Sequence, residues 1–291
     1  MAVDNTIIAN PLKLLKYTEV LEYSLKGGLR PDGRTPGEAR EAAISSGFIG
    51  TANGSGCMKL DRTSAVCGIK VELSKVPLSY TKGNFSCKVQ FPAVCSVNSR
   101  KGQIQQTDIC NSIELLISEL IEPGIINLPG TEKPLIKLED LRILDTNWVW
   151  NLDANVLCTS YDGNATDVCI GAFVAALKSL ELPAVVVNKD DGKPLIDENG
   201  PRTGLALNSH PFSTTFALYD QILLMDPTGL EEEALFGNSL TIISDGKEPI
   251  KVSKSGGSIS ATKLREAINI ANIRQATLFQ LMMDNGESID K

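Results

Sequence analysis

The sequence contains a single histidine, His210, and only 5% of its residues are aromatic. One histidine excludes a zinc site built from three imidazoles, and a catalytic triad or a Cys–His pair would have to use this residue. His210 precedes Pro211 at a predicted strand start and has no nucleophile beside it, so we predict a hydrogen-bonded structural histidine. The scarcity of aromatic residues argues against a base-stacking platform. The neighbouring Trp148 and Trp150 are predicted to serve packing.

Long hydrophobic runs and paired cysteine motifs are also missing. No stretch of about 18 apolar residues occurs, and no basic start precedes an apolar run, so we expect neither a membrane-spanning helix nor a signal peptide. The seven cysteines are an odd set without C-x-x-C spacing, and most lie in apolar runs where a free thiol packs as a small hydrophobic side chain. We therefore expect a reducing, intracellular compartment and no metal or cofactor.

The chain carries a modest negative net charge. Asp plus Glu number 35 against 28 Lys plus Arg, which gives a net charge of −7. This balance argues against a protein that coats nucleic acid by counterion release, although a local basic patch can still contact RNA. With 291 residues, 42% of them hydrophobic, the chain can form a sizeable core in one large domain or two modest ones.

Hydrophobic periodicity predicts alternating groups of strands and helices. The expected strands are a meander over 42–76, a strand near 86–91, a long strand within 141–161, and shorter strands at 184–187, 212–219, 222–225 and 240–244. The expected helices cover 11–25, a segment from an N-cap at Thr107 to Ile121, a segment from Thr166 to before Pro183, and a last one from about Ser260. Residues 188–204 are expected to form a surface hairpin or insertion. This order favours one α+β domain over a parallel doubly wound sheet.

Two patterns are candidates for chemistry. Residues 254–258 lead into the last predicted helix, where backbone N–H groups can hold an anion, but a glycine turn for tight helix entry is favoured. Carboxylates cluster in residues 231–233 and in pairs within 190–198, where they can hold Mg²⁺ or act as acid and base. A solvated helix start is the favoured explanation of the glutamate run. The residues alone thus indicate no convincing active site.

Basic side chains in loops form the candidate RNA contacts. Arg100 and Lys101 lie in a polar stretch before the first long predicted helix of the domain, and Lys82 lies in an earlier loop. Such residues can contact phosphates, and they are equally typical of solvated loops.

Five segments in order resemble the motifs of RNase PH-like domains, and in particular those of exosome ring subunits. The resemblance extends from about residue 20 to residue 283. The segments are Arg30–Arg34, Ala52–Gly68, Tyr161–Asn164 followed by Ala172–Leu177, Asp226–Glu233 and Lys254–Gly257.

The resemblance implies an RNase PH fold of the α+β class, with two pseudo-symmetric βαβ-type halves. It implies an N-terminal helix and linker over 1–29, a single domain over 30–283 and a tail over 284–291. The implied partners are the other subunits of a six-membered ring, S1/KH cap proteins and RNA, with no membrane. The implied locations are the nucleus, the nucleolus and the cytoplasm.

The same resemblance implies that catalysis has been lost. Thr166 falls where active members of the family have a phosphate-binding arginine, and Asn238 and Ser239 fall where they have an acid. The arginine pair that grips RNA falls near Ile104 and Gln105. No catalytic residue is therefore assigned.

Three functions remain open. The first is a non-catalytic subunit that forms the RNA channel of the exosome ring and supports 3′-to-5′ RNA processing and degradation. The second is an active phosphate-dependent 3′-to-5′ exoribonuclease, alone or completed by its heterodimer partner. The third is a small-molecule enzyme that uses Asp162, the Glu231 cluster and the glycine turn. For the ring subunit we expect an obligate hetero-oligomer in which partners cover strands such as Ser64–Val71.

Overall fold

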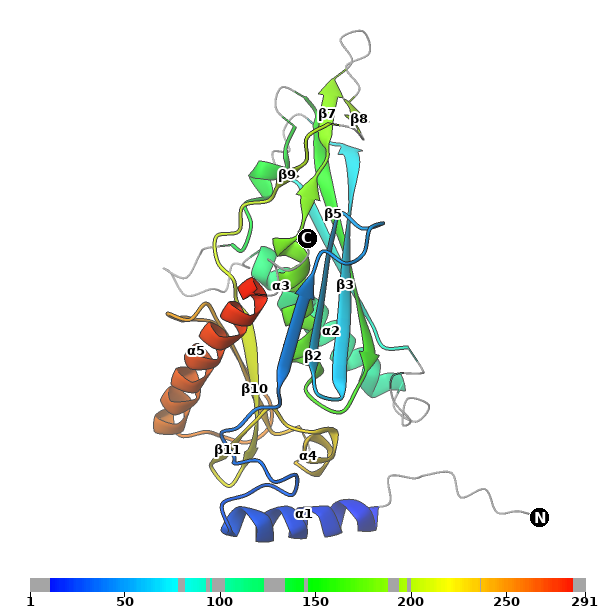
Figure 1. Cartoon of the computed structure of the whole chain (residues 1–291). Coiled ribbons are helices and arrows are strands. Elements are labelled where there is room, and N and C mark those ends of the chain that lie inside the picture. The colour runs from blue at the N-terminus through cyan, green and yellow to red at the C-terminus, as the bar shows by residue number, and fades with distance from the viewer. Residues whose placement is uncertain are drawn as a thin grey trace, which may run out of the picture.

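The computed structural model places two sheets around one central helix (Figure 1). It describes residues 11–77, 82–92, 95, 103–122, 134–143, 146–187, 194–197, 200–235 and 237–284. The helices are α1 (Pro11–Lys26), α2 (Gln103–Ile121), the short 3-10 helix η1 (Leu138–Leu141), α3 (Ala165–Lys178), α4 (Gly229–Ala234) and α5 (Ala261–Asp284).

The larger sheet has five strands in the order β1-β2-β3-β5-β4. These strands are β1 (Ala42–Ser46), β2 (Gly54–Leu60), β3 (Thr63–Lys75), β4 (Asn84–Gln90) and β5 (Trp148–Ser160). The pairs β1–β2, β2–β3 and β3–β5 are antiparallel, whereas β4 runs parallel to β5 and is connected to it through α2. The segment β4–α2–β5 is therefore a βαβ unit.

The second sheet has four strands in the order β11-β10-β12-β13. These are β10 (Phe212–Tyr219), β11 (Ile222–Met225), β12 (Ser239–Ser244) and β13 (Pro249–Lys254). Strands β11 and β12 both pair antiparallel with β10, so they run parallel to each other and α4 connects them. This second βαβ-type unit agrees with the two halves expected from the sequence.

Two short hairpin-like pairs complete the strands. Strand β7 (Ala184–Val187) pairs antiparallel with β8 (Pro194–Asp197), and β6 (Glu181–Leu182) pairs with β9 (Thr203–Gly204). Within the segment 188–204, expected to be a surface hairpin or insertion, the described strands β8 and β9 pair with β7 and β6, which precede the segment, and not with each other.

Helix α3 forms the centre of the core because it is buried nearly all round. Its residues from Val168 to Leu177 are completely buried, and it contacts both the larger sheet and β10. At Gly56 on β2, a Cβ atom would lie 2.3 Å from the carbonyl oxygen of Ala172. Glycine is therefore required at this position for the sheet to approach α3 so closely.

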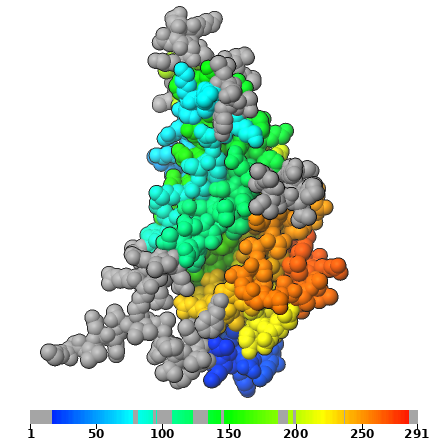
Figure 2. All heavy atoms as spheres, turned by 180° about the vertical axis from the view of Figure 1, so that it is seen from behind, coloured from blue at the N-terminus to red at the C-terminus, as the bar shows by residue number. Residues whose placement is uncertain are grey.

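The remaining helices cover the outside of this core. Helix α2 packs on β4, and an ion pair of 2.6 Å between Glu119 and Lys251 joins it to β13. The face opposite to that of Figure 1 shows α2 beside the orange residues of the second sheet (Figure 2). Helix α5 packs on β10, β12 and β1, and α1 packs on α4 below the second sheet. Among the described helices, none is long and apolar enough to cross a membrane.

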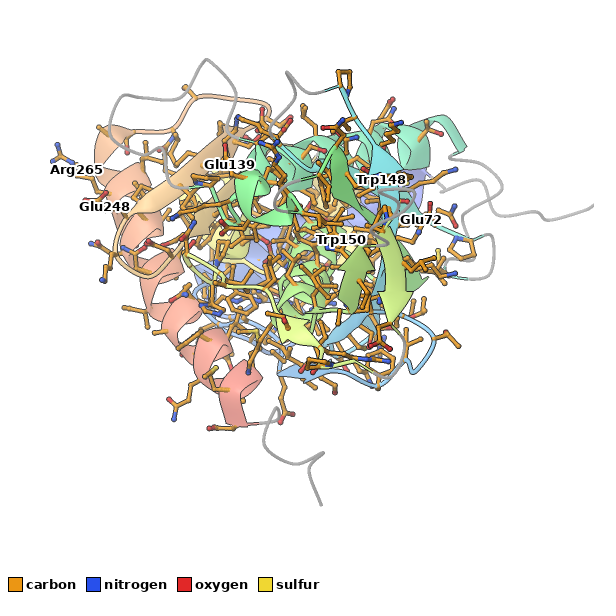
Figure 3. All side chains as sticks on the ribbon, turned by 90° about the horizontal axis from the view of Figure 1, so that it is seen from above. Glu72, Glu139, Trp148, Trp150, Glu248 and Arg265 are labelled. Atoms are coloured by element: carbon orange, nitrogen blue, oxygen red, sulfur yellow. The ribbon has the colours of Figure 1, made fainter. Side chains whose placement is uncertain are left out.

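Side-chain burial follows the expected pattern for the tryptophans and cysteines. Trp150 is 5% exposed and lies toward the middle of the molecule seen from above, whereas Arg265 and Glu248 lie at its periphery (Figure 3). All seven cysteines are free. The packing role predicted for Trp150 is confirmed.

Several expected boundaries were wrong. Helix α2 begins at Gln103, so Thr107 lies inside it rather than at its N-cap. The long strand begins at Trp148 instead of near residue 141, because Leu138–Leu141 forms a 3-10 turn with Leu141 buried. Strand β13 was not predicted.

The strand segment Ser64–Val71 was also misjudged. It belongs to β3, which is hydrogen-bonded to β2 on one side and to β5 on the other. It has no free edge for a partner to cover, because the edges of this sheet are β1 and β4.

Candidate functional site

A pocket of about 610 Å³ opens between α2, the start of α3, α4 and the strands β10 and β12. Helices and strands that are far apart in the sequence supply its walls. The lining residues are Asp108, Ile109, Ser112, Tyr161, Ala165, Thr166, Thr215, Ala217, Pro227, Gly229, Glu232, Glu233, Leu235, Gly237, Asn238, Ser239, Thr241 and Ser255.

The pocket brings together three positions that the sequence singled out. Thr166 lies in the first turn of α3, and Asn238 and Ser239 lie where β12 begins. Asn238 donates from Nδ2 to the carbonyl of Leu218 at 2.9 Å and accepts at Oδ1 from Lys254 Nζ at 2.8 Å. Both ends of the Asn238 side-chain amide are therefore engaged in hydrogen bonds within the pocket wall.

The charged groups of the pocket wall are acidic. Asp108, Glu232 and Glu233 line it, and among the described residues no Lys, Arg or His does. Glu232 accepts hydrogen bonds from the Tyr161 hydroxyl at 2.7 Å and from the Asn164 N–H at 2.8 Å. Burial raises the pKa of Glu232, and burial together with the Glu232 charge raises the pKa of Tyr161 well above its usual range. Phosphate would meet negative charge here.

Glu231 contradicts the expectation of a solvated glutamate run. It is completely buried and forms a bidentate pair with Arg30, whose Nε lies 2.9 Å from Oε1 and whose Nη2 contacts Oε2. Glu231 also completes a capping box with Thr228 at the start of α4. The helix start was predicted correctly, but a carboxylate that neutralises a buried arginine does not face solvent.

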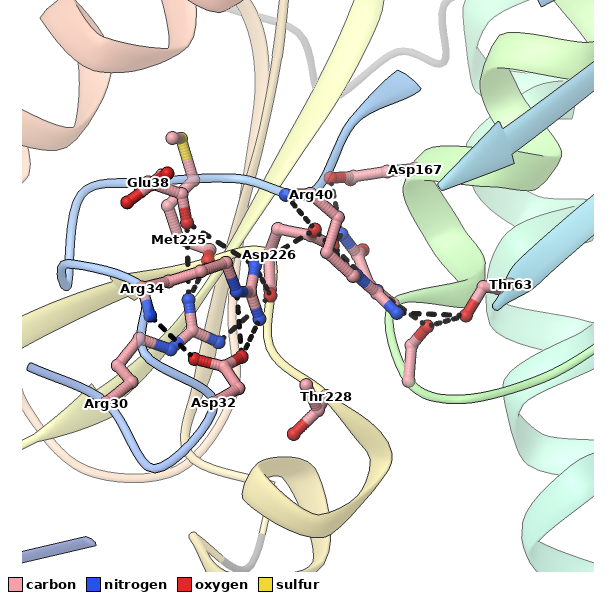
Figure 4. Close-up of polar contacts among 12 residues, drawn as sticks. Arg30, Asp32, Arg34, Glu38, Arg40, Thr63, Asp167, Met225, Asp226 and Thr228 are labelled. Carbon is pink, nitrogen blue, oxygen red and sulfur yellow. Dashed lines mark hydrogen bonds and ion pairs between the residues drawn. The ribbon is translucent and has the colours of Figure 1, made fainter. Parts of the chain in front are cut away.

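A second buried carboxylate, Asp226, joins the two halves of the molecule (Figure 4). It pairs with Arg40 and accepts from Asn164 Nδ2 at 2.6 Å. Burial opposes the ionisation of Asp226, but the hydrogen bond and charge of Arg40 and the charge of Arg274 outweigh burial and hold its pKa well below the usual range. Asp226 has a φ of 53°, a backbone conformation that asparagine and aspartate tolerate better than most residues.

The start of α3 packs on this network. The Asp167 carboxylate accepts from the Thr215 hydroxyl at 2.8 Å and from Asn164 Nδ2 at 2.8 Å, and Arg274 of α5 lies 3.6 Å away. Burial raises the pKa of Asp167, with the Arg274 charge opposing it. Gly163 has a φ of +81°, and a Cβ there would lie 2.4 Å from the backbone of Gly229. These contacts fix the floor of the pocket.

Sequence reasoning missed the partners in this network. Arg30 and Asp226 belong to segments that were singled out, but Arg40, Asp167 and Arg274 do not. The sequence shows each of them only as a charged residue in an otherwise apolar or turn segment. This does not identify the partner, which for Arg40 is Asp226, 186 residues away.

The residues of the small-molecule site considered from the sequence have separate structural contacts and do not form one site. Asp162 is 4.0 Å from the exposed Arg62, while both oxygens of Glu231 are engaged by Arg30 and Thr228. The glycine turn does not open α5, because Ser260 accepts from the N–H of Lys263 and so serves as its N-cap. Gly256 instead packs on Asn238, where a Cβ would lie 2.9 Å from its Cα.

Of the candidate basic residues, the structure describes Lys82, which does not line the pocket. Lys82 is exposed and lies 3.8 Å from Glu139 of η1. The structure does not describe Arg100 or Lys101. It also does not describe the acidic residues at positions 190, 191 and 198. Nothing is described of the side chains at positions 104 and 105.

His210 has a structural environment. Its ring centroid lies 5.0 Å from that of Phe279, and its carbonyl accepts from Gln275 Nε2 at 2.8 Å. Burial lowers the pKa of His210, with the Lys178 charge acting in the same direction. Packing on Phe279 supports the structural role predicted for this residue.

Comparison with protein families finds two adjacent matches. Residues 38–183 match the 3′ exoribonuclease family, domain 1, and residues 210–274 match domain 2 of that family. Both halves of the fold are therefore covered.

Individual proteins agree with this result. The chain is 30% identical to exosome complex component rrp43 of Schizosaccharomyces pombe over 262 residues, which cover 89% of this chain and 92% of the relative. It is 30% identical to exosome complex component Rrp42 of Methanopyrus kandleri, with 89% and 92% covered.

Two solved structures share the fold. A chain of an archaeal exosome core superposes with a TM-score of 0.75 at 19% identity, covering 95% of this chain and 100% of that one. A chain of the Archaeoglobus fulgidus exosome with RNA bound to the active site gives a TM-score of 0.75 at 21% identity, covering 92% and 98%.

Proposed function

The chain belongs to the 3′ exoribonuclease family, with both of its domains, and on this premise we propose that it is a non-catalytic subunit of an exosome ring. In this role it forms part of the RNA channel and supports 3′-to-5′ RNA processing and degradation, including ribosomal RNA maturation and mRNA decay. Segments 209–217 and 224–229 resemble the ring subunit ribosomal RNA-processing protein 43, and the fission yeast relative is named rrp43. That position in the ring is the one we propose.

The observation that carries the proposal is the charge of the described pocket wall. Phosphorolysis needs cations that hold the attacking phosphate and stabilise charge in the transition state. The wall has Thr166 where the family resemblance places the phosphate arginine and Asn238 and Ser239 where it places the acid, and its ionisable groups are carboxylates and Tyr161. Such a pocket repels phosphate instead of binding it.

The proposed assembly follows from the same family. Other RNase PH-like subunits are the ring partners, S1/KH proteins cap the ring, and RNA passes through it. Lys82, Arg100 and Lys101 are the proposed RNA contacts. Residues 30–283 are the proposed domain, and the proposed locations are the nucleus, the nucleolus and the cytoplasm.

The test is an assay of phosphate-dependent RNA decay. The chain alone, and the chain with its ring partner, are incubated with polyadenylate and phosphate, and release of nucleoside diphosphate is measured. We expect none from the chain alone. Any activity of the pair should be unchanged when Thr166→Ala and Ser239→Ala are introduced together, with the exposed Arg265→Ala as the matched control.

Decay that is lost in the Thr166→Ala, Ser239→Ala variant but kept in the control would contradict the proposal. It would support the alternative, an active phosphorolytic exoribonuclease completed by this chain.

A further inference from the structure

A second cavity, of about 550 Å³, lies where α5 passes the segment before β10 and the turn between β12 and β13. It shares no lining residue with the pocket described above. Its volume is within the range of pockets that take a small molecule, which is about 300–1,000 Å³. Its wall includes Asn208, His210, Asp245, Lys247, Gln275 and Phe279.

Two aromatic rings supply an apolar part of this wall. The ring centroids of His210 and Phe279 lie 5.0 Å apart, with their planes at 53°, and both residues are partly exposed. Burial lowers the pKa of His210, and the Lys178 charge acts in the same direction, so the imidazole is uncharged at neutral pH. Unpaired nucleic-acid bases stack on such rings, and a single base needs no extended aromatic platform.

Two side-chain amides of the wall present free oxygen atoms. Gln275 Nε2 donates to the carbonyl of His210 at 2.8 Å, and Asn208 Nδ2 donates to the carbonyl of Pro134 at 2.8 Å. Because a backbone carbonyl can only accept, these bonds determine which end of each amide is the nitrogen. Gln275 Oε1 and Asn208 Oδ1 accept no hydrogen bond from a described residue. Gln275 is only 6% exposed, so its oxygen is an acceptor in a fixed position.

Asp245 adds a third acceptor to the wall. Its Oδ1 accepts from the N–H groups of Lys247 and Glu248 at 3.0 and 3.1 Å, whereas its Oδ2 accepts from no described residue. A wall with three free acceptors and two rings selects a planar ligand that carries several N–H donors. Guanine has N1–H and N2–H₂ side by side on one edge, whereas uracil has one N–H between two carbonyls.

We propose that this cavity binds a guanine base. The base stacks against His210 and Phe279, and its N–H groups donate to the free amide and carboxylate oxygens of the wall. The exposed Lys247 contacts a phosphate attached to the nucleoside. The base belongs to a free guanine nucleotide or to an RNA strand, since both present the same edge. The proposal does not rest on the non-catalytic role proposed above, because base binding is measured without RNA decay.

The test uses the full chain in its native complex and 8-azidoguanosine monophosphate as a photoreactive probe. After irradiation, labelled peptides are mapped by mass spectrometry. We expect label within residues 245–247 or residues 275–283, protection by guanosine and guanosine monophosphate, and no protection by uridine. Stronger protection by a guanine-rich oligonucleotide than by the mononucleotide identifies RNA as the source of the base, and the reverse identifies a free nucleotide. Either order supports the base site.

Two variants separate recognition of the base from recognition of the phosphate. Phe279→Leu removes the stacking ring and keeps an apolar side chain, so it should weaken guanosine binding about 5- to 100-fold. Lys247→Ala should weaken binding of guanosine monophosphate about two- to fivefold and leave guanosine unchanged, because only the nucleotide carries the phosphate. The matched control is Arg265→Ala, an exposed position on the same helix, and it should bind both ligands as the wild type does.

Label that avoids both peptides would overturn the proposal, as would equal protection by guanosine and uridine. The peptide map needs no variant, and Lys247 is exposed, so the test does not depend on the folding of Phe279→Leu. Wild-type affinity for guanosine in a folded Phe279→Leu protein, or for guanosine monophosphate in Lys247→Ala, would also overturn it.

Discussion

The Arg40 guanidinium holds the Asp226 carboxylate with two hydrogen bonds of 2.8 Å, from Nε to Oδ2 and from Nη2 to Oδ1. The Arg40 backbone N–H adds a third at 2.9 Å. Both side chains are buried, and they join the segment before β1 to the end of β11. Because Asn164 at the start of α3 binds the same carboxylate, this pair determines how the two halves of the fold meet beneath the pocket.

Asp226→Asn should lower the free energy of unfolding by about 3–5 kcal/mol, because it leaves the Arg40 charge buried without a counterion. Urea unfolding at neutral pH measures this. Asp32→Asn is the matched control, since Asp32 is a partly exposed partner of Arg34 and should cost less than about 1 kcal/mol. Equal losses of unfolding free energy in the two variants would show that the buried pair stabilises the fold no more than the partly exposed one.

Asp226 should also make the protein sensitive to acid. Its pKa in the folded state lies below the ordinary aspartate value of 3.8, so the folded state binds this proton less readily than the unfolded chain. The contribution to stability is therefore complete above pH 3.8 and is lost as the pH falls from there through the folded pKa. Unfolding free energies measured across this acid range should fall less steeply in Asp226→Asn than in the wild type.

Gly56→Ala should destabilise the fold by about 1–3 kcal/mol or more, because the added Cβ would overlap the backbone of α3. The clash is with the Ala172 carbonyl at 2.3 Å and the Ala176 nitrogen at 2.4 Å. Thermal unfolding compares it with Gly37→Ala, where no atom lies within 4 Å of the new Cβ. A wild-type melting temperature for Gly56→Ala would mean that β2 and α3 can separate at little cost.

Arg100→Ala combined with Lys101→Ala should weaken RNA binding by a reconstituted ring. Each phosphate contact that is lost lowers the slope of log affinity against log salt by about one unit. Lys82→Ala is tested separately, and the exposed Arg265→Ala is the control. Titrations at several salt concentrations give the slope, and an unchanged slope and affinity would place the RNA path elsewhere.

The chain should bind other RNase PH-like subunits tightly and should not persist as a monomer in the cell. Its net charge of −7 gives little drive toward self-association, so we expect unlike subunits as partners. Co-purification with mass spectrometry identifies them, and light scattering gives the stoichiometry. Recovery of a stable monomer at high concentration that ignores such subunits would contradict this expectation.

The sequence by itself determined most of the local structure. The apolar period from Ile109 to Ile121 predicted the body of α2, and the turn at 61–62 was predicted where it connects β2 to β3, whereas residues 54–56, predicted as part of a turn, belong to β2. Order along the chain was sufficient to predict an α+β fold, because hydrophobic period and turn residues act over short distances.

Only the tertiary structure decided which charges meet and where the pocket opens. Glu231 looked like part of a solvated run and is instead buried against Arg30, which lies 201 residues away. Ser64–Val71 looked like an edge and is paired on both sides. Thr166 and Asn238 line the same cavity only because the fold brings the start of α3 close to the start of β12. Ion pairing and burial depend on distance in space, and the type of a residue does not identify a partner that is distant in the sequence.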